Sequence, residues 1–149
     1  MKFFKKPLHF IMAFAFIATT ASFAQDKVSE TELTNFANAY TDIQVVNEKA
    51  QTEMVKVIEN SGMKIETFNV MYQASQNPNA PMPAEVSETD TKKYEEVVVE
   101  IEKMQPVFQK EMETAIADNN MTVERYQQVV TMLQTDPELQ QKLQAKMQQ

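Results

Sequence analysis

Carboxylate groups are the residues of this sequence with the widest choice of chemistry. Glu95, Glu96, Glu100 and Glu102 lie close together on one predicted helix. A pair of carboxylates could act as general acid and base, and several together could bind calcium. Acidic residues are, however, spread along both long predicted helices, and the Asp-rich loop of an EF-hand does not occur in the sequence. We therefore interpret these acids as a solvated helix face and keep a carboxylate-based metal-binding protein as an alternative.

Methionine, tyrosine and carboxamide side chains are the other candidates for binding. The methionines are spread over predicted core positions, not gathered in the tight cluster that a copper site requires, so we interpret them as flexible core filling. Tyr40 and Tyr94 could line an apolar groove, although packing in the core with the hydroxyl at the surface is favoured. Asn47 and Gln105 interrupt two otherwise apolar helical stripes. Either they fix the register of the helices or the contact with a partner, or they reach solvent at a helix edge.

The first 24 residues have the pattern of an export signal. Three lysines at positions 2, 5 and 6 precede an apolar run over residues 8–18 that only His9 interrupts. Ser22 and Ala24 are small, as a signal peptidase requires, so we expect cleavage between Ala24 and Gln25. The apolar run is well short of the roughly 20 residues that span a bilayer. We therefore expect a protein exported through the inner membrane to the periplasm, or secreted.

Removal of this segment leaves a chain with no histidine, cysteine or tryptophan and with 11 basic against 21 acidic residues, a net charge of −10. Nucleophile–histidine catalysis is then excluded, and so are zinc, copper or haem sites built from imidazole or thiolate. We expect no enzyme activity and no cofactor. So acidic a surface repels phosphate groups and anionic lipid, so we expect neither nucleic-acid binding nor direct binding to anionic membranes.

The chain contains an internal repeat with an offset of 58 in the numbering. Residues 28–76 (unit one) align without a gap to residues 86–134 (unit two), with 12 identities in 49 positions. A repeat of this length indicates one supersecondary unit used twice. About 125 residues remain after processing, enough for one modest core, so we predict a single helical domain over residues 25–149.

Each unit is predicted to form a long helix, a tight turn and a shorter helix. Apolar residues recur in steps of three and four along both long helices. Gly62 and Asn119–Asn120 favour the left-handed conformation that ends a helix. Because the turn is short, we expect the two helices of a unit to lie antiparallel. Residues suited to cap the starts of the long helices are Ser29 with Glu32 and Ser87 with Asp90.

Proline marks the remaining boundaries. Three prolines within residues 77–85 predict an extended linker between the units. Asp136 followed by Pro137 predicts the start of a C-terminal helix over residues 136–147. Pro106 lies inside the second long helix and is expected to kink or split it near Gln105. The predicted fold is all-α, with two helical hairpins and a C-terminal helix packed as a bundle.

The residues of these elements resemble a bacterial family known only as domain of unknown function number 4168. Phe36, Ala39 and Tyr40 match its first helix. Its later elements, an acidic helix with methionine, a turn and a terminal motif, are matched by Met112, Met121–Tyr126 and Asp136–Leu139. Asn120 stands where the family has glycine, and residues 77–80 of unit one depart from the terminal motif. The resemblance implies an exported helical protein and supplies no catalytic residues.

These observations favour a non-enzymatic helical protein that acts through protein–protein contacts, either with another protein or with a second copy of itself. A periplasmic holdase-type chaperone is an alternative, because such chaperones share the helical shape, the acidity and the abundance of methionine and glutamine.

Overall fold

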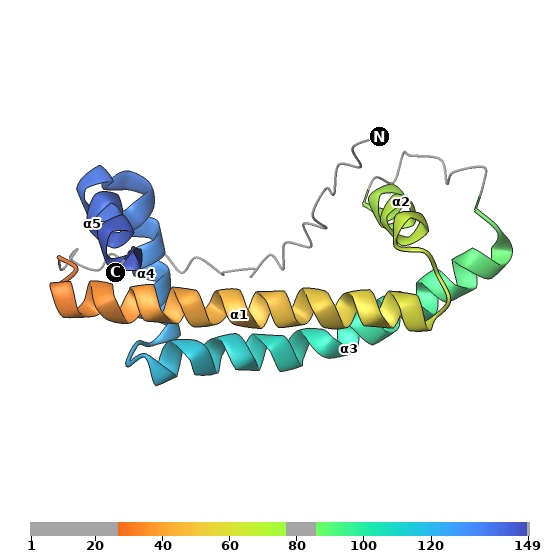
Figure 1. The fold of residues 1–149 in the computed structure, drawn as a ribbon, viewed down its shortest axis with the longest axis horizontal. Helices are drawn as coiled ribbons and strands as arrows, with labels where there is room; N and C mark the ends of the chain where they lie inside the picture. The colour runs from red at the N-terminus through yellow and green to blue at the C-terminus, as the bar shows by residue number, and fades with distance from the viewer. Residues whose placement is uncertain (1–26, 77–85, 149) are drawn as a thin grey trace.

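The computed structural model describes residues 27–76 and 86–148, which form five α-helices and contain no strand (Figure 1). The all-α class predicted from the sequence is thereby confirmed. The predicted export signal with its cleavage site at Ala24 and Gln25, and the predicted linker at residues 77–85, lie outside the described residues. The helices are α1 (Glu30–Asn60), α2 (Ile65–Ser75), α3 (Glu88–Asp118), α4 (Val123–Thr135) and α5 (Pro137–Met147).

The long helices α1 and α3 lie side by side and antiparallel (Figure 1), and their contact is the largest between any two described helices. Lys49 on α1 pairs with Glu111 on α3 at 2.7 Å. Seven residues earlier on α1, Asp42 accepts a hydrogen bond of 2.7 Å from Asn119, which follows α3. Residue numbers thus rise along α1 as they fall along α3. We call this antiparallel pair the rod.

The helix bounds repeat at the offset found in the sequence. Both ends of α3 fall at the positions equivalent to the ends of α1, and α4 begins at the position equivalent to the start of α2. Both predicted capping boxes are present at the starts of α1 and α3, since each serine accepts a hydrogen bond from the backbone N–H three residues on, and the acidic side chain there accepts one from the serine N–H. Gly62 (φ 70°) and Asn120 (φ 55°) adopt the left-handed conformation predicted after the long helices.

The short helices lie at opposite ends of the rod (Figure 1), with α2 at one end and α4 and α5 at the other. In Figure 1 the helix α1 runs across the view, whereas α2 is seen nearly end-on and α4 runs upward past α1. Each short helix therefore crosses its own long helix steeply, which differs from the antiparallel packing expected from the short turn. A tight turn limits the distance between two helices but not their crossing angle, which is set by side-chain packing.

Aromatic contacts show that each end of the rod is built from both units. At the α2 end, Phe68 of unit one packs against Tyr94 near the start of α3, with ring centroids 5.3 Å apart. At the α4 end, Tyr126 of unit two stacks on Phe36 near the start of α1, at 4.7 Å. Each short helix thus packs on the first turns of the other unit's long helix. The two units are therefore related by an approximate twofold axis.

Two hydrophobic clusters fill the two ends. Met54, Met63, Met71, Met112 and Met121 are buried, so methionine fills the core as predicted. The α2-end core consists of Ala50, Met54, Ile58, Met63, Phe68, Met71, Val97, Ile101 and Phe108. The α4-end core consists of Phe36, Ala39, Ile116, Met121, Tyr126 and Val129.

Pro106 lies inside α3, which nevertheless continues as one helix from Glu88 to Asp118. Of the two predicted outcomes, a kink or a split near Gln105, the split is wrong. Proline removes one backbone hydrogen bond and crowds the preceding turn, which bends a helix without necessarily ending it. Figure 1 shows α3 bending along its length beside the straighter α1. The bent helix still packs along α1, because residues on both sides of Pro106 contribute to the end cores.

Candidate functional site

The two carboxamides singled out in the sequence do not meet. Asn47 is half-buried on α1, whereas Gln105 is exposed on α3. Because Lys49 faces Glu111 in the antiparallel pair, Asn47 lies opposite about residue 113, roughly two turns away from Gln105. The structure therefore places them at separate points of the α1–α3 seam, with no contact between them across it.

The tyrosines belong to the two ends of the rod and not to one groove. Tyr94 packs on Phe68, and its hydroxyl donates a hydrogen bond to Ser75 at 3.0 Å. Tyr40 is 37% exposed at the opposite end. Burial, together with the neighbouring Tyr40, raises the pKa of Tyr126 to about 12, so this phenol stays protonated at neutral pH. Tyr40 and Tyr94 therefore do not share a binding surface.

The acidic residues do not converge on a metal site within residues 27–76 and 86–148. In these ranges no group of three or more carboxylates is arranged to hold a metal ion. Glu95, Glu96, Glu100 and Glu102 are exposed along α3, and Lys103 pairs with Glu100 at 2.6 Å. These acids have the geometry of a solvated helix face.

An ion pair joins the two units at the α4 end. The guanidinium of Arg125 on α4 donates one hydrogen bond to each carboxylate oxygen of Glu32 on α1, at 2.5 and 3.0 Å. These bonds hold the pKa of Glu32 below its usual range. Glu32 also completes the capping box of Ser29. The pair therefore ties α4 to the first turn of α1.

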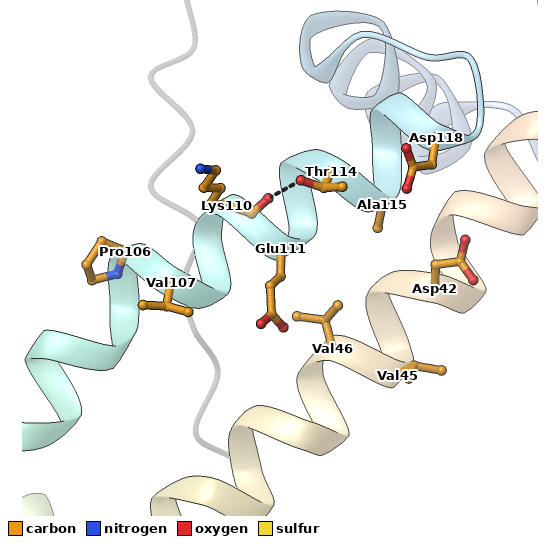
Figure 2. A pocket seen from close by; sticks show the side chains of 10 residues that line it. All are labelled: Asp42, Val45, Val46, Pro106, Val107, Lys110, Glu111, Thr114, Ala115 and Asp118. Atoms are coloured by element: carbon orange, nitrogen blue, oxygen red, sulfur yellow. Dashed lines mark hydrogen bonds between the residues drawn. The ribbon is translucent and has the colours of Figure 1, made fainter.

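A groove opens along the seam between α1 and α3, between the middle of the rod and its α4 end (Figure 2). This seam groove has a volume of about 660 Å³ and is lined by side chains from residues 42–46 of α1 and residues 106–118 of α3. Val45 and Val46 on one helix and Pro106 and Val107 on the other give it apolar walls. Val45 and Val107 are 60% and 55% exposed, so neither belongs to an end core. The seam groove is therefore a candidate surface for receiving a ligand.

Acidic side chains surround these apolar walls. Asp42, Glu111 and Asp118 line the groove together with one base, Lys110. In Figure 2 Asp42 and Asp118 lie at the end nearest the turn into α4, Glu111 points from α3 toward α1, and Lys110 points away from α1. The hydrogen bond to Glu111 raises the pKa of Lys49. Because Glu111 has this partner and Asp42 and Asp118 are exposed, the negative charge is concentrated at the α4 end of the groove.

A comparison with models of protein families matches the chain over residues 15–81 and again over residues 29–143 to the family described as Domain of unknown function (DUF4168). The chain belongs to the DUF4168 family. The two matches overlap, which fits a chain whose two halves resemble each other. Comparisons with curated proteins and with solved structures found no match. Among the helices that the structure describes, none combines the length and the apolar character that a membrane span requires.

In this DUF4168 protein the repeat supplies an internal comparison for the groove. The approximate twofold axis relates the groove to the part of the same seam nearer the α2 end, where charged residues replace Val45, Val107 and Pro106 and the apolar Met104 replaces Val46. Charged side chains at these positions are thus compatible with the fold, and packing alone does not require valine. The equivalent residues are Lys103 for Val45, Lys49 for Val107 and Glu48 for Pro106.

Sequence reasoning missed the seam groove because it followed only the apolar stripes that face the cores. Val45 and Val107 lie outside the residues that define those stripes. The signal that could have found them is the difference in polarity between equivalent positions of the two units. A position that is apolar and exposed in one unit and charged in the other is a candidate for a role that the fold does not impose.

Proposed function

We propose that this protein is an exported, non-enzymatic binding protein that docks another protein on the seam groove. The observation that carries the proposal is the pair Val45 and Val107, which are more than half exposed where the equivalent residues are lysines. Covering exposed apolar surface stabilises a complex by roughly 25 cal/mol per Å², and exposed apolar patches rimmed by polar residues are typical of interaction sites. The export pattern of residues 1–24 and the lack of histidine and cysteine after it support the same function.

Site-specific photo-crosslinking tests this proposal. A photoreactive phenylalanine analogue is placed at Val45 or at Val107, and the cells that make the protein are irradiated. Val70 and Val99 are matched controls, because they are 45% and 48% exposed and lie outside the groove. We expect covalent adducts with one or a few proteins from the two groove positions and none from the two controls. An absence of adducts at both groove positions would contradict the proposal.

The two alternative functions, a holdase-type chaperone and a carboxylate-based metal-binding protein, predict different results in this cross-linking experiment and in assays on the purified protein. Adducts with many unrelated proteins at all four positions, together with suppressed aggregation of an unfolded client at near-equal molar ratio, would support the holdase-type chaperone. A melting temperature raised by calcium and not by magnesium would support the carboxylate-based metal-binding protein.

A further inference from the structure

We infer that the seam groove takes a basic amphipathic helix of the partner protein. The inference rests on the proposed function and specifies the chemistry of the docked segment. Three observations support it: the shape of the groove, the position of the exposed valines and the distribution of charge around them.

The shape of the groove fits a helix. The side chains of two antiparallel helices leave a furrow along their seam, and a third helix places a ridge of side chains into such a furrow. The lining residues of α3 run from Pro106 to Asp118, which is about 18 Å at 1.5 Å per residue. A docked helix of about three turns therefore matches the length of the groove. Val45 and Val107 stand on opposite helices, so one apolar ridge can contact both.

The charge of the groove selects a basic segment. Three carboxylates and one lysine line it, and Lys49 already pairs with Glu111. The exposed carboxylates of Asp42 and Asp118 therefore face the flank of any docked helix near the α4 end. Lysine or arginine beside the apolar ridge would pair with them, whereas acidic residues would be repelled. A second copy of this chain is disfavoured as occupant, because it would bring the same acidic groove and a net negative charge, −7 for the full sequence.

Synthetic peptides of defined sequence provide the probe. A fluorescein-labelled peptide long enough for about four helical turns carries leucine on one helical face and lysine on both flanks. A second peptide has glutamate in place of every lysine, and a third has the basic composition in an order without an apolar face. Binding to the processed full chain is measured by fluorescence anisotropy at low and at physiological salt.

Paired variants connect binding to the groove. Val45→Lys with Val107→Lys introduces into the groove the lysines found at the equivalent positions of the other unit, so the fold should be retained, which circular dichroism checks. Val70→Lys with Val99→Lys adds the same charge at exposed valines elsewhere. We expect the basic peptide to bind at least tenfold more tightly than the acidic and reordered peptides. The groove variant should weaken this binding at least tenfold, the control variant less than threefold, and higher salt should weaken it in the parent protein.

The remaining outcomes separate this inference from the proposed function. Equal binding of the basic and acidic peptides, both lost in the groove variant, would overturn the basic partner while leaving protein docking in the groove intact. If no peptide bound while cross-links formed at Val45 and Val107, the basic partner helix would likewise be overturned and protein docking in the groove would be retained. Equal loss in both lysine variants would show that binding is unspecific attraction and would overturn the inference. A parent protein that sediments as a dimer and a groove variant that sediments as a monomer would identify a second copy as the occupant.

Discussion

The two ends of the rod are built from equivalent positions of the two units, yet among the described residues the α4 end carries contacts that the α2 end lacks. α2 begins after Lys64, whose side chain makes no capping hydrogen bond. α4 begins after Thr122, whose hydroxyl accepts a hydrogen bond from the backbone N–H of Arg125, and α4 is joined through Asp136 to α5. The two units therefore share one scaffold, and residues that differ between them supply the additional contacts at the α4 end.

The fifth helix is the largest difference between the ends. Lys146 of α5 pairs with Glu30 at the start of α1 at 3.1 Å. Leu33 and Ala37 lie on the same helical face as Glu30, three and seven residues on, and both are buried. Their equivalents on α3, at residues 91 and 95, are threonine and glutamate. The long helix is therefore apolar where α5 covers it and polar at the equivalent place.

A smaller exchange distinguishes the aromatic contacts. At the α2 end the hydroxyl of Tyr94 donates to Ser75. At the α4 end the equivalent residues are Phe36 and Leu133, and Leu133 packs against the α4-end core. A buried phenol needs a hydrogen-bond partner and a phenyl ring does not. The tyrosine–serine pair of the α2 end is thus matched by a phenylalanine–leucine pair at the α4 end, and each pair suits the packing of its own end.

The largest expected effect tests whether the two ends are coupled. Phe68→Ala and Phe36→Ala each remove a ring from one end core, and we expect each to lower the free energy of unfolding by about 3–5 kcal/mol. Because α1 and α3 pass through both ends, each variant should unfold in a single transition in urea. Val70→Ala, at an exposed position, should stay within about 0.5 kcal/mol. Two separate transitions would show that the ends are independent.

A medium effect is expected from α5. Leu139 is 7% exposed, and Leu139→Ala should lower the free energy of unfolding by about 2 kcal/mol, because a buried leucine is lost near the edge of a core. Leu139→Met conserves volume and should cost less than about 1.5 kcal/mol. Both values come from urea denaturation. If Leu139→Ala changed stability by less than about 0.5 kcal/mol, as an ordinary surface substitution does, α5 would add little to the α4 end.

The smallest effect concerns the ion pair between Arg125 and Glu32, and it depends on pH. Both side chains keep about a quarter of their surface exposed, at 26% and 23%, so Arg125→Gln should cost only about 0.5–1 kcal/mol at pH 7. The pKa of Glu32 is lowered in the folded protein. The contribution is therefore present above the ordinary glutamate pKa of about 4.3 and is lost as the pH falls through the folded value.

Urea denaturation at pH 7 and at pH 2.5 checks this sign. The difference between Arg125→Gln and the parent protein should shrink toward zero at the lower pH. Thr67→Ala, at the equivalent position of α2, should change stability by less than about 0.5 kcal/mol at both pH values. A cost for Arg125→Gln that grows on acidification would contradict the assignment.

The elements of the fold could be predicted because their signals are local. The capping box of Ser29 involves a residue three positions on, and the left-handed turn depends on Gly62 alone. Because the units align at a fixed offset, the helix bounds of the first unit also predict those of the second. Such signals specify where a helix begins and ends.

The arrangement of the short helices and the seam groove could not be predicted in the same way. An apolar stripe indicates which face of a helix is buried but not which other helix covers that face. The position of Phe68 within its stripe therefore does not indicate that it packs on Tyr94 of the other unit. The groove depends on Val45 and Val107, which lie on different helices. They belong to one surface only because these two helices pack antiparallel. Long-range geometry of this kind is absent from the periodicity of a single sequence.

Spin-label distances test the central claim, that α1 and α3 are antiparallel with each end shared by both units. The chain has no cysteine, so two can be introduced freely. Thr41→Cys is combined with Asp118→Cys in one protein and with Lys92→Cys in another. Asp118 follows Lys92 by 26 positions on the same helix, which is about 39 Å at 1.5 Å per residue.

Pulsed dipolar spectroscopy is then recorded with excess unlabelled protein, so that only distances within one chain contribute. The structure predicts a short distance for residues 41 and 118, next to the contact between Asp42 and Asn119, and a distance longer by tens of ångströms for residues 41 and 92. The reverse order, short for 41 and 92 and long for 41 and 118, would contradict the antiparallel pair and every contact that depends on it.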